Sequence, residues 1–373
     1  MNALDHDVVI VGGGPAGSSA AAHLAREGHD VLLLEKASFP RQKLCGEFLS
    51  TEVAGLCSNL GVLNDMVEAG ARRISTLELT GMDGPAFRCR LPGTAYALSR
   101  RSFDNLLFQH ARRAGAHACD GESVRSIHGD LQQGFRVETD SRTVTATVVL
   151  GAYGRRSRLD RHLQRGFLDR QTSFVGFKAP FSGPVREGTI ELHTFDMGYC
   201  GLIGDECGTV NVCWLARADR LREAGGSPES MLGSVLSTNP HLRARFGELD
   251  RVGAFLAVGQ LSFMPKSLFV SDVCMIGDAA GMIAPLCGDG MGMALRSGEM
   301  AASLVDAYLS GRCSAGAFKS AYRTRWTREF AMRMRIGRWL NGVLTRSTLS
   351  TWAVKAARRA PRVAGAVISA TRG

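Results

Sequence analysis

Residues 7–35 read DVVIVGGGPAGSSAAAHLAREGHDVLLLE, and this stretch decides the fold. It begins with the β-branched run Val8–Val11, which is typical of a short strand buried on both faces. After a glycine-rich turn, the Ala- and Leu-rich segment Ser18–Arg26 predicts a helix, which Gly28 ends. The apolar run Val31–Leu34 predicts a second strand. The order of these elements is that of a β-α-β unit, so the sequence predicts an α/β fold.

The glycines of the turn, Gly12, Gly14 and Gly17, have the spacing G-x-G-x-x-G. The first allows a tight turn, the second lets the backbone approach a pyrophosphate, and the third lets the helix pack closely on the sheet. Glu35, at the end of the second strand, can accept hydrogen bonds from an adenosine ribose. We therefore expect a dinucleotide site rather than a plain glycine-rich turn. The stretch leaves NAD and FAD as alternatives.

The length, the apolar runs and the cysteine spacing limit the class of protein to which the chain can belong. At 373 residues the chain can hold two domains. It has no run of about 18 apolar residues, and no basic segment precedes its first apolar run, so we expect neither a membrane span nor a signal peptide. Its ten cysteines include no C-x-x-C pair, which argues against a zinc or iron–sulfur site. We expect reduced thiols, no metal and a cytoplasmic location.

The charge is concentrated at one end of the chain. The formal net charge is +10, yet residues 323–373 contain 12 Arg or Lys and a single acid, Glu329. The other residues therefore sum to about neutrality. The basic character belongs to the tail, which matters when partners are inferred.

The rest of the chain alternates between predicted strands and helices. Strands are expected at 74–79, 86–91, 124–127, 135–139, 143–150, 258–264 and 273–276, and antiparallel strands between 174 and 215. Helices are expected up to Leu60 with Ser50 and Thr51 as caps, from 98–104 to Gly115, over 227–246 with an interruption near Pro240, and over Met291–Ser310.

A second glycine-rich helix start decides between the two cofactors. Residues 277–292 read GDAAGMIAPLCGDGMG and lie between a predicted strand and a predicted helix. Two such helix starts, some 260 residues apart, suit a long, extended cofactor. Asp278 would bind the hydroxyls of a ribityl chain, and the glycines before Met291 would let backbone N–H groups approach an isoalloxazine ring. This interpretation favours FAD.

These motifs resemble the FAD-dependent para-hydroxybenzoate-hydroxylase-type superfamily, in its geranylgeranyl reductase and flavin-dependent halogenase branch. The matching blocks are GGGPAG with Glu35, PRQKLCGEFLS, LSRRSFD and GDAAG…P…GDGMGMA, which together span residues 7–295. The resemblance implies that FAD is bound by Gly12, Gly14, Pro15, Ala16, Gly17, Glu35, Lys36, Arg41, Gly46, Arg100, Val124, Gly277, Asp278, Pro285, Gly288, Gly290, Met291 and Gly292.

Three departures limit what the resemblance implies. Tyr153 stands where the superfamily has an Asp that helps NAD(P)H engage, so binding of NAD(P)H, the expected reductant, is left open. Gly281 stands where the aromatic hydroxylases have His. In this respect the chain resembles the reductase branch. The halogenases' W-x-W-x-I-P signature is absent, which argues against halogenation.

The candidate catalytic residues lie in the CGE loop. Cys45 would lie beside the flavin, or be a small buried residue. Glu47 would exchange a proton near the ring, or be a loop carboxylate paired with Arg41 or Lys43. We interpret Asp289 as a solvated loop acid. His193 and Tyr199 are better explained as core or surface residues.

The resemblance implies a Rossmann-like, GR2-type three-layer FAD-binding domain with an inserted antiparallel β-sheet substrate domain and a helical C-terminal tail. The predicted boundaries are 1–72, 97–165 and 266–310 for FAD binding, 73–96 and 166–265 for substrate, and 311–373 for the tail. We favour an NAD(P)H-dependent monooxygenase that hydroxylates an apolar, aromatic or polyketide- or lipid-like small molecule in secondary metabolism. The alternatives are a geranylgeranyl reductase-like C=C reductase and a non-enzymatic flavin-binding module.

Two interpretations of the tail stay open. Trp326, Phe330 and Met334 recur at helical spacing, so one helix face can be buried while the arginines stay solvated. Such a helix would form a lid over the substrate cavity. The basic charge instead suits peripheral contact with an anionic membrane. We expect no nucleic-acid partner, because no recognised binding motif accompanies the charge. The oligomeric state is left open.

The first glycine turn gives a direct test. Valine at position 14 would place a side chain where the pyrophosphate is expected, so Gly14→Val should purify as colourless apoprotein, whereas the parent protein should be yellow with one FAD per chain. Absorbance of the purified proteins measures this. Normal FAD content in the variant would contradict the assignment of this turn.

Overall fold

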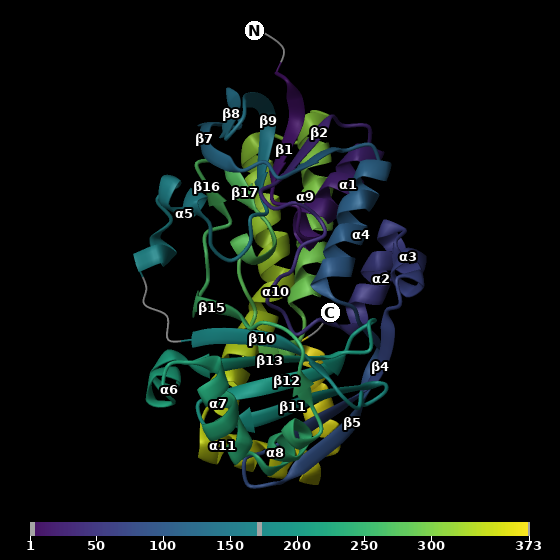
Figure 1. Ribbon diagram of the computed structural model, residues 1–373. Helices are drawn as coiled ribbons and strands as arrows, with labels where there is room; N and C mark the ends of the chain where they lie inside the picture. The colour runs from purple at the N-terminus through teal and green to yellow at the C-terminus, as the bar shows by residue number, and fades with distance from the viewer. Residues whose placement is uncertain (1–3, 170–173, 372–373) are drawn as a thin grey trace.

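The computed structural model describes residues 4–169 and 174–371 and arranges them around two β-sheets (Figure 1). The first sheet has the order β16-β17-β9-β1-β2-β6, and its central strands are parallel. All of β2 and most of β1 are buried, which explains their uninterrupted apolar runs. The β7–β8 hairpin joins this sheet through pairing of β8 with β9. The strands are β1 His6–Val11, β2 Val31–Glu35, β6 His117–Asp120, β7 Val124–Asp130, β8 Gly134–Thr139, β9 Thr143–Gly151, β16 Phe269–Val270 and β17 Val273–Met275.

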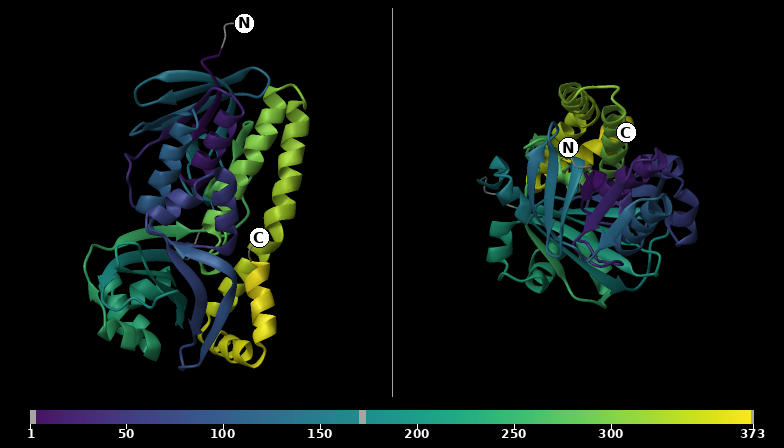
Figure 2. Two further views of the ribbon diagram at one scale, coloured as in Figure 1. Left: turned by 90° about the vertical axis from the view of Figure 1, so that its right-hand side faces the viewer. Right: turned by 90° about the horizontal axis from the view of Figure 1, so that it is seen from above.

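The helices of this half pack side by side (Figures 1 and 2). Helix α1 (Pro15–Arg26) lies between α4 (Arg100–Arg113) and α9 (Gly290–Leu309). The contact between α1 and α9 is unusually close, because a Cβ added at Gly298 would lie 2.4 Å from the carbonyl oxygen of Ala16. The first turn of α1 therefore packs directly against the middle of α9. The shorter helices here are α2 Thr51–Leu60, α3 Leu63–Glu68 and α5 Arg158–His162.

The second sheet forms the other half of the molecule and has the order β14-β10-β13-β12-β11-β4-β5-β3, with β15 beside β10. The expected antiparallel pairing holds at every described pair except β4 with β11, which is parallel. These two strands are far apart in sequence, so no hairpin fixes their relative direction. The strands are β3 Phe48–Leu49, β4 Arg72–Thr80, β5 Ala86–Ala97, β10 Phe174–Ser182, β11 Thr189–Phe195, β12 Gly198–Gly204, β13 Val210–Arg217, β14 Asp250–Arg251 and β15 Leu256–Leu261.

One face of the second sheet is covered by the helices α6 (Ala218–Glu223), α7 (Pro228–Ser234) and α8 (Pro240–Gly247). The predicted helical segment 227–246 is thus two helices separated by a 3-10 turn. Pro240 begins α8 at the first helical position, where its missing N–H costs nothing, and Asn239 caps it by accepting a hydrogen bond from the N–H of His241 at 2.9 Å. We call this face the outer face of the sheet.

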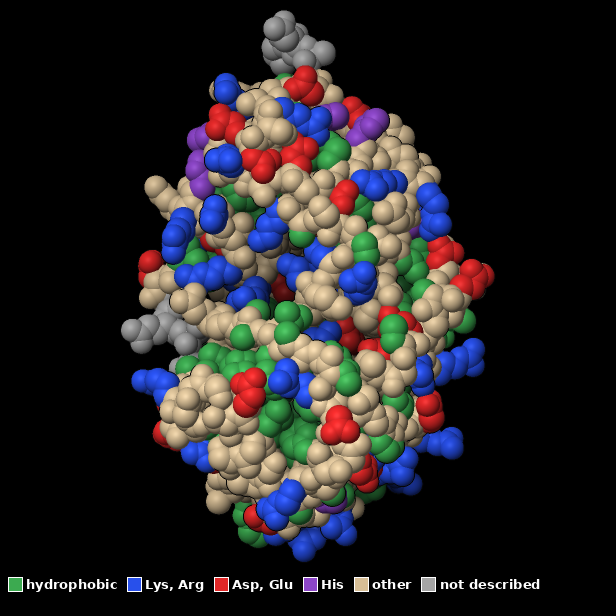
Figure 3. All heavy atoms as spheres, viewed as in Figure 1, with side chains coloured by type: hydrophobic (Ala, Val, Ile, Leu, Met, Phe, Trp, Pro, Cys, Tyr) green, Lys and Arg blue, Asp and Glu red, His purple; other side chains and the backbone are tan. Residues whose placement is uncertain are grey.

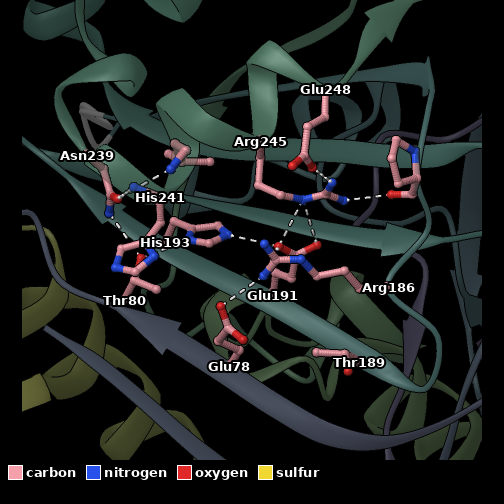
Figure 4. Close-up of polar contacts among 12 residues, drawn as sticks. Glu78, Thr80, Arg186, Thr189, Glu191, His193, Asn239, His241, Arg245 and Glu248 are labelled. Carbon is pink, nitrogen blue, oxygen red and sulfur yellow. Dashed lines mark hydrogen bonds and ion pairs between the residues drawn. The ribbon is translucent and has the colours of Figure 1, made fainter. Parts of the chain in front are cut away.

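A buried ion network ties the outer face to α8 (Figure 4). Glu191 is 2% exposed and accepts hydrogen bonds from Nε of Arg245, 3.1 Å away, while Arg186 forms a second ion pair at 3.0 Å. His193 is fully buried beside it, with Nδ1 2.7 Å from Oγ1 of Thr80. Burial lowers the pKa of His193 and favours the neutral ring. His193 is therefore a core residue, as interpreted from the sequence.

The C-terminal region is helical, as expected. Helix α10 (Ala315–Leu344) runs along α9 and continues down to the second sheet, where α11 (Ser347–Arg359) and α12 (Pro361–Ala370) pack against β5 (Figure 2). Helix α11 also reaches β11, where Oγ1 of Thr194 donates to Oγ of Ser350 at 3.3 Å. These helices cover the face opposite the outer face, which we call the inner face. Among the described helices, none has the length and hydropathy needed to cross a bilayer.

The ion network predicts a large loss of stability on breaking one pair. In Arg245→Met, Glu191 would stay buried without its main partner, which costs about 3–5 kcal/mol. Urea unfolding should show this loss. Arg243→Met is the control on the same helix, because Arg243 is exposed, and its effect should stay within about 0.5 kcal/mol. Equal stability of the two variants would contradict a structural role for the network.

Candidate active site

The first glycine turn combines crowded and open positions. A Cβ at Gly12, whose φ is +114°, would lie 2.4 Å from the carbonyl oxygen of Ala152, and one at Gly17 would lie 1.9 Å from that of Gly12. Both glycines are thus required by the turn itself. Gly14 differs, because its Cβ would meet only the guanidinium of Arg41, at 3.8 Å. Space is therefore left at the position where the pyrophosphate is expected.

A chain of buried charges surrounds this space. Glu35 accepts hydrogen bonds from the N–H of Gly13 at 2.9 Å and from Arg41 at 3.3 Å, and Arg41 also donates to Asp104 at 2.7 Å. Arg100 donates to the other oxygen of Asp104 at 2.6 Å. Nε of Arg41 is buried and has no partner among the described residues. The guanidinium group that lies beside the open glycine is cationic, which fits an anionic phosphate.

The sequence analysis missed Asp104, although its position four residues after Arg100 on one helix is a signal for an ion pair. Asp104 is fully buried, and it holds the two arginines that the resemblance assigns to FAD. In this structure the side chain of Arg100 is engaged with Asp104. Its contact with phosphate stays a prediction.

The second glycine motif lies directly beside the first. Gly277 has a φ of +58°, and a Cβ there would lie 2.8 Å from Cβ of Ala16. The carboxylate of Asp278 accepts no hydrogen bond from any residue that the structure describes. Burial raises the pKa of Asp278, against the opposing effect of nearby cations: Lys266, Arg100, Arg155 and Lys43. Figure 3 shows Lys and Arg side chains around a hollow in this face. An unpaired acceptor here fits the hydroxyls of a ribityl chain.

The interpretation of Asp289 as a solvated acid is wrong. Asp289 is fully buried, accepts a hydrogen bond from Ser50 at 2.7 Å and pairs with Arg333 of α10 at 3.2 Å. Burial and the neighbouring Glu52 raise its pKa to about 7. Ser50 is the residue before α2, but its hydroxyl binds Asp289 instead of capping the helix through its side chain. The error arose because Arg333 lies in the tail, far along the chain.

The glycines around Asp289 are again of two kinds. Gly288 has a φ of +67°, and a Cβ there would lie 2.6 Å from the ring of Phe48, so the local packing requires this glycine. A Cβ at Gly292 would lie 2.3 Å from Oε1 of Glu52 and would displace that side chain. A Cβ at Gly290 would meet nothing within 4 Å. The N-terminus of α9 is thus open at the position where the resemblance expects the isoalloxazine ring.

In the CGE loop, Glu47 has a partner that the sequence analysis missed. Glu47 is 2% exposed, and its carboxylate forms an ion pair with Nζ of Lys178 on β10 and accepts the N–H of Arg100 at 3.0 Å. Pairing with Arg41 or Lys43 is therefore wrong. Burial raises the pKa of Glu47, although Lys178 opposes the shift. The signal for Lys178 was its place as the single charge in the strand FVGFKAPFS.

Further polar groups gather around this ion pair on the inner face. Lys178 lies opposite Cys213 in the β10–β13 register. Asn211, two residues before Cys213, donates to the carbonyl oxygen of Cys45 at 3.1 Å. Cys45 itself is half-buried and its sulfur accepts the N–H of Glu47 at 3.4 Å. The two candidate catalytic residues, Cys45 and Glu47, thus lie in one cluster with Lys178.

The adjoining part of the inner face is apolar. Tyr199 is buried, and its hydroxyl accepts the N–H of Leu286 at 3.0 Å. It packs in a cluster that joins the second sheet to the loop after Gly281, formed by Tyr199, Leu215, Leu261, Phe263, Met282 and Ala284. A Cβ at Gly281 would lie 3.0 Å from Cε of Met334 and 3.1 Å from the ring of Trp326. Helix α10 thus fills the space beside this glycine.

The remaining predicted residues differ in their exposure and in the elements that carry them. Pro15, Ala16 and Met291 are in the first turns of α1 and α9. Lys36 and Gly46 are exposed, Val124 is half-buried at the start of β7, and Pro285 is exposed. Tyr153, in place of the expected Asp, donates to Sδ of Met275 at 3.3 Å. A contact of these residues with FAD stays a prediction.

Comparisons with known proteins agree with this geometry. Residues 5–199 match the family described as FAD binding domain. The menaquinone reductase of Mycobacterium tuberculosis is 30% identical over 353 residues, covering 88% of this chain and 83% of that protein. The flavin-dependent brominase Bmp2 superposes with a TM-score of 0.83 at 20% identity, covering 98% of this chain and 93% of its own. A geranylgeranyl bacteriochlorophyll reductase-like protein from Thermoplasma acidophilum superposes with a TM-score of 0.78 at 18% identity, covering 98% of this chain and 99% of its own. The resemblance to the reductase and halogenase branch is confirmed.

The unpaired carboxylate of Asp278 can be tested by its effect on FAD affinity. If it accepts hydrogen bonds from the ribityl chain, Asp278→Ala should weaken FAD by about 1.5–3 kcal/mol for each bond lost. Titration of apoprotein with FAD, followed by fluorescence quenching, measures this. Asp250→Ala, on the exposed strand β14, is the control and should bind FAD normally. Unchanged affinity of Asp278→Ala for FAD would mean that Asp278 does not bind the ribityl chain and is only a residue at the start of a helix.

Proposed function

Because the chain belongs to the FAD-binding domain family, we propose that it is an FAD-dependent reductase that adds hydrogen across a C=C bond of an apolar, lipid-like substrate. The observation that carries the proposal is the buried Glu47–Lys178 pair on the inner face, beside an apolar wall. A C=C reduction needs both a proton source and a dry substrate site, and these lie next to each other here.

The residues of the proposed site have separate roles. When bound, reduced FAD supplies a hydride, and the proposed reductant that regenerates it is NAD(P)H. Lys178 and Glu47 hold a proton between them, because burial favours the neutral acid while the ammonium group favours the carboxylate. One carbon of the double bond receives the hydride and the other receives this proton. The apolar wall around Tyr199 would orient the substrate and exclude water.

The likeness to menaquinone reductase supports reduction over hydroxylation. It extends over most of both chains, at an identity where the sequences, and not only the folds, are related. The sequence analysis put a monooxygenase first and a C=C reductase second, although the FAD motifs do not distinguish the two reactions. The reductase therefore becomes our first proposal for this chain.

Hydroxylation is the second candidate, and the apolar wall favours it too. Oxygen activation at a flavin needs a water-poor site, which the cluster around Tyr199, Phe263 and Met282 would provide. The two reactions give different products from one substrate. With NADPH and a prenylated quinone under air, reduction adds two hydrogen atoms, whereas hydroxylation adds one oxygen atom, which isotopically heavy O₂ would label. Mass spectrometry of the product distinguishes them.

The same assay addresses the non-enzymatic alternative. A flavin-binding module would oxidise NADPH at the same slow rate with and without a substrate. Substrate-dependent oxidation without labelled oxygen in the product supports the reductase. Labelled product supports the monooxygenase instead.

The proposed proton source predicts a defect in turnover. Lys178→Met and Glu47→Gln should each lower the rate at which substrate oxidises the reduced enzyme by about 10²–10⁴-fold, the usual contribution of acid–base catalysis. FAD content should stay normal, and the solvent deuterium effect on this step should change. Lys178→Arg keeps the charge but donates its proton poorly, so it should also be slow. A parental rate in Lys178→Met would contradict the proposal.

A further inference from the structure

The outer sides of the three C-terminal helices expose large apolar side chains. Met332, Trp339, Leu349, Trp352 and Val363 are between 41% and 65% exposed, and they are half of the large hydrophobic residues that the described chain exposes. Trp339 and Trp352 are the most unusual, because tryptophan is rarely left in water. We call the surface that carries these five residues the C-terminal outer face.

The same helices carry the positive charge without compensation. Nine of their Arg and Lys side chains are exposed, namely Arg323, Arg325, Arg328, Arg335, Arg346, Lys355, Arg358, Arg359 and Arg362. Their one acid, Glu329, is half-buried and pairs with Arg333 at 2.6 Å. Along α10, Arg328, Met332, Arg335 and Trp339 follow at helical spacing, so cations and apolar groups share one side of the helix.

The other side of α10 lines the candidate site. Met334 approaches Gly281, and a Cβ at Gly337 would lie 3.0 Å from Sγ of Cys287. Arg338 donates to the carbonyl oxygen of Phe263, in the apolar wall, at 3.4 Å. A single helix thus separates the C-terminal outer face from the wall.

We propose that the C-terminal outer face docks on an anionic lipid membrane. Exposed tryptophans suit the interface between water and lipid, where their rings have one apolar and one polar edge. The surrounding cations suit anionic headgroups. Association with a second copy through this face would bring Arg328 and Arg335 of one copy toward the cations of the other, which disfavours a symmetric dimer. Delivery of a lipid-like substrate past α10 rests on the proposed function, whereas the docking itself does not.

Vesicle sedimentation with the full-length, FAD-loaded protein tests the docking. The protein should sediment with vesicles of phosphatidylcholine and phosphatidylglycerol, stay in solution with phosphatidylcholine alone, and be released by high salt. On binding, tryptophan emission should shift to shorter wavelength. Binding to neither kind of vesicle, or equal salt-independent binding to both, would overturn the proposal.

Matched variants locate the contact. Arg335→Glu with Arg346→Glu should lower partition onto anionic vesicles by about 30-fold or more, and Trp339→Ser with Trp352→Ser should abolish the emission shift. Val252→Ser with Met264→Ser, which alters exposed apolar residues outside these helices, should bind like the parent. Equal loss in this control would overturn the assignment of the face.

Two readouts separate the competing outcomes. Light scattering on the soluble protein should give the same mass for the parent and for the tryptophan variant, and a parental dimer lost in that variant would overturn the proposal in favour of an interface between copies. Turnover of a detergent-dispersed substrate does not depend on docking. Activity without vesicle binding refutes the docking alone, and vesicle binding without activity refutes the proposed function alone.

Discussion

The structure depends on the direct contact between the backbones of α1 and α9. No side chain separates Gly298 from the first turn of α1, and Oγ of Ser19 donates to the carbonyl oxygen of Leu295 across the same contact at 3.2 Å. This contact brings together two helices that hundreds of residues separate in the sequence, and Gly277 adds a second close approach, because a Cβ there would lie 2.8 Å from Cβ of Ala16. The positions expected to bind the phosphates and the ring depend on this packing.

Around the cleft, charges are buried in connected pairs. Arg41 bridges Glu35 and Asp104, and Arg333 bridges Asp289, Glu52 and Glu329. Removing charges from water is costly, so each buried carboxylate must have a cation or several donors nearby. Asp278 differs from these carboxylates, because cations lie near it but no described residue forms a hydrogen bond or ion pair with its carboxylate, and this is why it stands out as a position suited to a ligand.

The sequence was sufficient to predict the structure wherever the residues involved are close together in the chain. The buried strands and the helix of the first β-α-β unit were correctly predicted, because each depends on neighbours within that unit. Binding of the ribose by Glu35 stays a prediction. The errors concern contacts between distant segments. Asp289 looked solvated because its partner, Arg333, lies on α10. The pairing of Glu47 with Arg41 or Lys43, one of its two alternatives, was wrong because the true partner, Lys178, is 131 residues away. The parallel pairing of β4 with β11 was missed for the same reason.

The glycines at positions 281 and 337 determine how closely α10 approaches the loop that follows β17. Both face the contact between α10 and the loop that follows β17, and neither has room for a Cβ without displacing Met334, Trp326 or Cys287. The helix therefore lies as near to the loop as backbone and neighbouring side chains permit. Any larger residue at either position would act as a wedge and widen the gap. These two glycines thus set the distance between α10 and the apolar cluster around Tyr199, to which Met282 and Ala284 of the loop belong.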